Sequence, residues 1–65
     1  MNLSDATNYD LFEATIDGEY TAAEIKRAAE ACGIPEENIL GPRQGYLISG
    51  WLEEHREMLL AEREK

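Results

Sequence analysis

The chain has 65 residues, a hydrophobic content of 43% and a formal net charge of −8, from 14 acidic and 6 basic side chains. A chain of this length forms one domain, here residues 1–65, and buries only about 60% of its unfolded surface, which disfavours a deep catalytic cleft. The negative charge disfavours nucleic acid and anionic membranes as direct partners, because phosphate groups attract the opposite sign.

The single cysteine, Cys32, has no partner for an intramolecular disulfide. The first residues lack the basic start and apolar run of a secretory signal, and no apolar stretch approaches the ~20 residues that span a bilayer. We therefore expect a cytoplasmic protein in a reducing compartment, without membrane contact.

The first predicted element covers residues 9–16, where the pattern is ambiguous. Apolar and polar residues alternate up to Ile16, and Asp17-Gly18 behind them is a strong turn signal, so we expect a β-strand. Tyr9, Phe12 and Ile16 also fit the spacing of one helix face.

The second element is a helix from Ala22 to Cys32. Thr21 and Glu24 have the spacing of a capping box, and Gly33 fits a left-handed helix end. One small apolar face repeats at helical spacing and consists of Ile25, Ala28, Ala29 and Cys32.

Two short apolar segments, residues 38–40 and 46–48, then flank a five-residue stretch with two glycines and a proline. This arrangement predicts a hairpin. In the alternative, Pro42 begins a long helix with Gly41 as its cap. Gly45 and Gly50 would then each cost about 1 kcal/mol inside that helix.

The last element is a helix from about Gly50 or Trp51 to Arg63. Its apolar arc consists of Trp51, Leu52, His55, Met58 and Leu59, and its opposite arc of Glu53, Glu57 and Glu64. We therefore predict a small α+β domain ordered strand, helix, strand, strand, helix, with a three-stranded antiparallel sheet and a long C-terminal helix. An all-α fold is the alternative.

Catalytic and ligand-binding patterns are missing from the sequence. His55 is the only histidine and Cys32 the only cysteine, which is too little for a nucleophile and its base, and both fit packing positions. Zinc, calcium and phosphate-loop spacings are absent. We expect no enzyme activity, no catalytic residue, no metal and no cofactor, with Trp51 in the core.

The acidic residues are therefore the main candidates for function. Six of them precede Lys26, the first basic residue. Residues four apart on a helix are separated by ~6 Å and alternate strand residues by ~6.8 Å, close to the phosphate spacing of a nucleic-acid strand. The predicted partner-binding surface consists of Asp10, Glu13, Asp17, Glu19 and Glu24, with a second patch at Glu53, Glu54 and Glu57.

In its acid-only opening and its final glutamates, the chain resembles the small acidic phage proteins that act as anti-CRISPR DNA mimics. The resemblance covers size and charge over the whole chain and implies a monomeric, stoichiometric inhibitor in the cytoplasm of a bacterial host cell. Its implied partner is a basic DNA-binding protein or complex, first a type I CRISPR-Cas surveillance complex, whose DNA-binding groove it would block.

Two other functions fit the same pattern. An acidic immunity protein or antitoxin would neutralise a basic nuclease. A small protein-protein adaptor would instead use exposed apolar residues such as Tyr46, Leu47 or Leu60.

Overall fold

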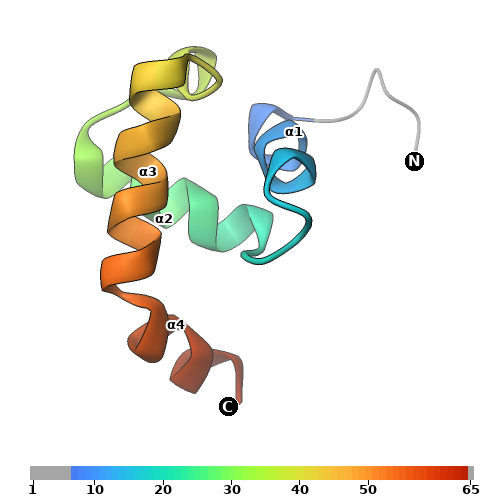
Figure 1. Cartoon of the computed structure of the whole chain (residues 1–65), viewed down its shortest axis with the longest axis vertical. Helices are drawn as coiled ribbons and strands as arrows, with labels where there is room; N and C mark the ends of the chain where they lie inside the picture. Colours follow the sequence, from blue (N-terminus) through green and yellow to red (C-terminus); the bar gives the residue numbers. More distant parts are fainter. Residues whose placement is uncertain (1–6, 65) are drawn as a thin grey trace.

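The computed structural model describes residues 7–64, which form four α-helices and one short 3-10 helix (Figure 1). The elements are α1 (Asn8–Thr15), α2 (Ala22–Cys32), η2 (Glu36–Asn38), α3 (Pro42–Glu54) and α4 (Arg56–Arg63). The described residues contain no strand. The predicted α+β fold with a three-stranded sheet is therefore wrong, and the all-α alternative is correct.

The segment predicted as a strand forms helix α1, and both ends of this helix are capped. Thr7 is the N-cap of a capping box: its hydroxyl accepts from the Asp10 backbone N–H, and the Asp10 carboxylate accepts from the Thr7 N–H at 3.0 Å. At the other end Asp17 has a positive φ of 55°, and the Gly18 N–H donates to the Glu13 carbonyl. Asp17-Gly18 thus ends a helix in a Schellman arrangement, where a turn at the end of a strand was expected.

Helix α2 has the limits predicted from the sequence. The Thr21–Glu24 capping box is present, and Gly33 ends the helix with φ 72°. Ile25, Ala28 and Ala29 are fully buried, so the predicted small apolar face is the side that packs.

The predicted hairpin is replaced by the first half of α3. Gly41 is the N-cap and Pro42 occupies the first turn, where its missing N–H breaks no helical hydrogen bond. A Cβ added at Gly45 would lie 3.5 Å from the Phe12 ring, an ordinary van der Waals contact, so α3 passes close to α1 at this residue. Gly41-Pro42 is therefore the start of α3 and not a hairpin loop, and Gly45 is a point where α3 packs close to α1.

The C-terminal helix ends at Arg63 as predicted, but it is interrupted. His55 has φ −107° and ψ 17°, outside the helical range, and separates α3 from α4. Its ring Nδ1 lies 2.8 Å from the Trp51 carbonyl oxygen, which also accepts the His55 backbone N–H at 3.0 Å. The chain bends here, and α4 turns away from the α3 axis (Figure 1).

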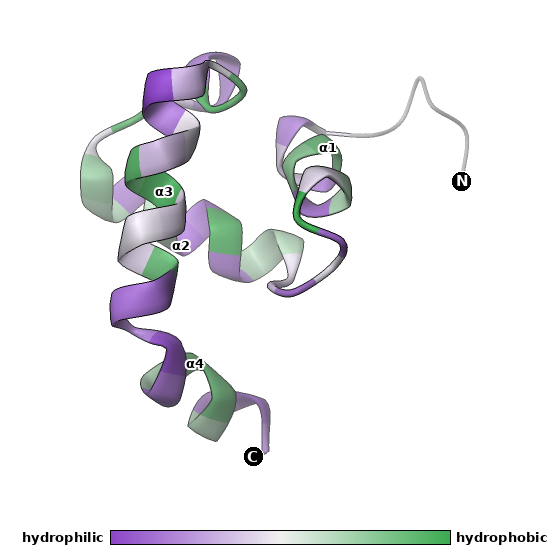
Figure 2. Ribbon diagram, viewed as in Figure 1, coloured by the Kyte–Doolittle hydropathy of each residue, from purple (hydrophilic) through white to green (hydrophobic). Residues whose placement is uncertain are grey.

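The core lies around α2, which packs against α1 on one side and α3 on the other. Its buried hydrophobic residues come from every α-helix and from the connections, and they are Phe12, Tyr20, Ile25, Ala28, Ala29, Ile39, Ile48, Leu52 and Leu59. Trp51 is half-buried against this cluster. Hydrophilic residues gather at the end of α3 and its junction with α4 (Figure 2).

The assignment of Gly50 to the interior of α3 gives a first prediction. A Cβ at Gly50 would meet nothing within 4 Å, so G50A should raise the free energy of unfolding by about 1 kcal/mol through helix propensity. For a domain of this size that corresponds to an increase in Tm of about 4–8 °C, measured by circular dichroism.

The matched control is G33A. Gly33 also has open space around it, but its φ is 72°, so alanine there should lower stability by about 1 kcal/mol. A destabilised G50A variant would contradict the helical assignment.

Candidate functional site

The two residues that most often carry chemistry, Cys32 and His55, serve packing here. The Cys32 thiol is half-buried with its Sγ 3.8 Å from the Leu47 carbonyl oxygen. The His55 ring stacks on Trp51, with ring centroids 4.0 Å apart. Within residues 7–64 no group of three or more His, Cys, Asp or Glu side chains is placed to hold a metal ion.

The acidic residues before α2 have different roles. The Asp10 carboxylate is used in capping, and the hydrogen bonds from the Thr7 backbone and hydroxyl hold its pKa below the usual value. Glu13 is half-buried on α1. Asp17 and Glu19 lie exposed in the turn between α1 and α2, and we call these two the turn acids.

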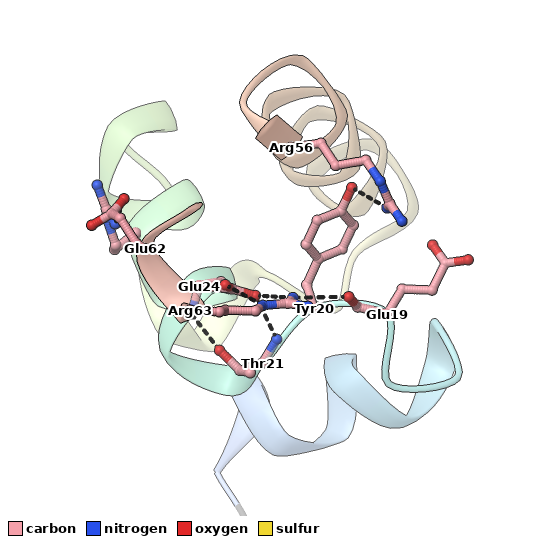
Figure 3. A network of polar contacts seen from close by, with 8 residues as sticks. Glu19, Tyr20, Thr21, Glu24, Arg56, Glu62 and Arg63 are labelled. Carbon is pink, nitrogen blue, oxygen red and sulfur yellow. Dashed lines mark hydrogen bonds and ion pairs between the residues drawn. The ribbon is translucent and has the colours of Figure 1, made fainter. Parts of the chain in front are cut away.

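Glu24, in contrast, is internal and does not belong to the exposed surface. It is 8% exposed and forms an ion pair with the Arg63 guanidinium, whose Nε lies 2.8 Å from Glu24 Oε2 (Figure 3). The other carboxylate oxygen accepts from the Thr21 backbone N–H at 2.9 Å. The hydrogen bonds from Arg63 outweigh burial and hold the pKa of Glu24 below its ordinary value.

The cations of α4 are exposed, but they make contacts with other parts of the chain (Figure 3). Arg56 donates to the Tyr20 hydroxyl at 3.1 Å, and its guanidinium lies 5.6 Å from the Tyr20 ring centroid. Arg63 also donates to the Glu19 carbonyl at 3.0 Å. These contacts join α4 to the start of α2. They engage the positive charges of Arg56 and Arg63 with groups of the same chain.

The three predicted C-terminal acids are all exposed. Glu53 and Glu54 end α3, and Glu57 lies in the first turn of α4; we call them the C-terminal acids. The interruption at His55 means that Glu53 and Glu57 do not lie on one regular helix, so the ~6 Å spacing argument fails for this pair. The absence of a strand in residues 7–64 removes the ~6.8 Å argument for Glu13 and Asp17.

One residue of each predicted patch acts electrostatically on Arg56. Glu53 and Glu19 both raise the pKa of this arginine, after the larger effect of the Tyr20 hydroxyl. These two acids are more than thirty positions apart in the chain.

A second acidic cluster was missed by the sequence analysis, because bases nearby in the chain balance its charge there. Glu36 bonds α1 directly: its carboxylate accepts from the Asn8 N–H at 3.3 Å and its carbonyl from the Asn8 side chain at 2.9 Å. Burial, and then the charges of Glu36, Glu30 and Glu37, raise the pKa of Tyr9. The signal available was the Glu36-Glu37 pair after Pro35, which indicates a helix-like first turn.

An apolar groove opens beside these surfaces, between α1 and α3, with a volume of about 310 Å³. We call it the α1–α3 groove. It is lined by Phe12, Thr15, Ile16, Ile39, Leu40, Gly41, Pro42, Gly45 and Ser49.

Comparison with known proteins found no match to any family model, curated protein or solved structure. In the described part of the chain, no helix has the length and apolar character needed to cross a bilayer. Functional inference therefore rests on the surface chemistry described above.

The Glu24–Arg63 pair gives a prediction about pH. Because the folded state lowers the pKa of Glu24 below its ordinary 4.5, the pair stabilises the fold above that pH, and this contribution is lost as pH falls through the folded-state pKa. E24Q should lower the free energy of unfolding at pH 7 by about 2 kcal/mol. The difference from the parent protein should shrink at pH 3, as measured by urea unfolding.

E62Q is the matched control. Glu62 pairs with Arg27 at 2.8 Å, but both side chains are nearly half exposed, so its loss should cost about 0.5 kcal/mol or less. An E24Q variant as stable as the parent at pH 7 would show that the buried pair is not stabilising.

Proposed function

We propose that this protein acts by binding, and that its acidic surface docks on a basic surface of a partner protein that normally binds nucleic acid. The observation that carries the proposal is the unequal use of charge in the fold. Arg27, Arg56 and Arg63 are held by contacts within the chain, whereas the turn acids and the C-terminal acids are exposed. Outside the two ion pairs, the carboxylates of residues 7–64 bond to no cationic side chain of that range.

The physical consequence is a surface with a negative field that attracts cations over long range. With a net charge of −8, association with a basic groove is accelerated by steering and weakens as salt rises. The carboxylates then take the place of phosphates in the partner's groove. The support comes from exposed charge and its clustering, since the regular phosphate-like spacing expected from the sequence is not retained.

Following the resemblance to anti-CRISPR DNA mimics, the first partner to test is the DNA-binding groove of a type I CRISPR-Cas surveillance complex. Binding there excludes target DNA and inhibits the complex stoichiometrically. The protein needs no cofactor for this function.

The second candidate is an apolar adaptor, and it has its own supporting observation. Tyr46 is 81% exposed and Leu47 48% exposed on α3. Such residues anchor protein interfaces when they are buried by a partner.

A competition experiment separates the two. Purified type I surveillance complex is shifted on a gel with its target duplex while this protein is added in excess, at low and at moderate salt. We expect loss of the DNA shift at low salt and partial recovery as salt rises, because screening weakens exposed charge interactions.

Charge-neutral variants identify the surface. D17N/E19Q/E53Q/E54Q/E57Q should raise the half-inhibitory concentration at least tenfold, with unchanged circular dichroism. Y46S/L47S is the matched control and should inhibit as the parent does. The reverse ranking, with weak salt dependence, would favour the adaptor, and an undisturbed DNA shift would remove DNA competition in this complex.

A further inference from the structure

The α1–α3 groove is an apolar feature of the described surface that docking through the acidic residues leaves unused. Its walls are mainly hydrocarbon: Phe12 and Ile16 from α1, Leu40 from the preceding turn, and Pro42 from α3. Leu40 is 46% exposed, so the groove leaves apolar surface in water that a partner's side chain would cover.

The groove is a consequence of how the helices are held. Both α1 and α3 pack on α2, and they approach each other at Phe12 and Gly45. Gly41 and Gly45 contribute no side chain to the α3 wall. Its volume of about 310 Å³ is at the small end of ligand sites and suits one or two side chains of a peptide.

Acidic residues next to the groove indicate the charge of the segment that would bind there. Asp17 directly follows Ile16, and Glu53 lies one turn after Ser49 on the same face of α3. The opposing cations are Arg56, bonded to the Tyr20 hydroxyl, and Arg43, next to Pro42.

A second copy of this chain is disfavoured as the occupant. Each copy carries a net charge of −8, and docking on this groove would bring acids against acids. Lysine or arginine beside an apolar side chain complements both the groove and its margin.

We propose that the α1–α3 groove receives an aromatic or aliphatic side chain of the partner, presented by a segment that carries lysine or arginine next to it. This proposal rests on the proposed function. It adds a source of specificity for the partner, because charge alone discriminates poorly between basic proteins. The apolar residue fills the groove, and the flanking cations face Asp17 and Glu53.

The test uses the ¹⁵N-labelled full chain and three blocked peptides, Lys-Lys-Phe-Lys-Lys, Lys-Lys-Ala-Lys-Lys and Glu-Glu-Phe-Glu-Glu, titrated by NMR. We expect the lysine–phenylalanine peptide to shift the amides of Phe12, Leu40 and Ser49. It should bind about tenfold more tightly than the alanine peptide, from burial of one aromatic side chain. The glutamate peptide should not bind.

Two variants and a control locate the site. L40S removes one wall, and S49L fills the groove from α3; each should remove the preference for phenylalanine over alanine while weak, salt-sensitive binding of both lysine peptides remains. L47S is the matched control, because Leu47 is 48% exposed on α3 and does not line the groove; it should keep the preference. Thermal unfolding checks that each variant is folded. Because L40S enlarges the groove and S49L fills it, the test does not depend on the stability of one variant.

The other outcomes are informative in different ways. Equal, salt-sensitive binding of both lysine peptides, or unchanged preference in L40S and S49L, would overturn the groove proposal and leave the acidic docking function standing. Binding of the glutamate peptide would overturn the charge assignment at the margin. No binding of any lysine peptide would contradict both proposals, and concentration-dependent shifts of groove amides without peptide would show that a second copy is the occupant.

Discussion

The structure depends on the small apolar face of α2. Ile25, Ala28 and Ala29 have no exposed surface, and the two alanines keep this face narrow enough for helices to approach from both sides. Without it, α1 and α3 would have no common support, since a domain of this size has too little interior for a second core. The position of every acidic residue on the surface follows from how these helices lie on α2.

The second organising feature is that three arginines are held by contacts within the chain, whereas most of the carboxylates of residues 7–64 are not. Arg63 and Arg56 of α4 bond to Glu24 and Tyr20, and these contacts hold α4 against the start of α2. Because these arginines are engaged in contacts within the chain, few cationic side chains remain to pair with the exposed carboxylates. The proposed docking on a basic partner and the salt dependence of that docking both follow from this division.

The acidic surface and the α1–α3 groove offer complementary contributions to recognition. Carboxylates act over several ångströms and tolerate imprecise placement, which favours fast encounter with any cationic groove. An apolar groove acts only on contact and requires a fitting side chain. A partner that satisfies both is distinguished from the many basic proteins that satisfy only the first.

Local sequence signals predicted those features that local physics decides. The capping box and glycine end of α2, the end of the last helix at Arg63, and the exposure of Asp17, Glu19 and the C-terminal acids are of this kind. Residues 9–16 and 38–48 were assigned wrongly because alternation, Asp-Gly and Gly-Pro each permit two structures. Asp17-Gly18 became a helix cap and Gly41-Pro42 a helix start, and both of these helices bury their apolar residues against α2.

Net charge, the caps of α2 and its amphipathic face were thus determined by the sequence alone, because each depends on residue type and on neighbours within about four positions. Only the tertiary structure decided that Glu24 is buried against Arg63, that the charges of Glu30, Glu36 and Glu37 raise the pKa of Tyr9, and that Phe12 and Gly45 border one groove. These contacts join residues far apart in the chain. Their geometry is set by how the helices pack on α2, which no local pattern encodes.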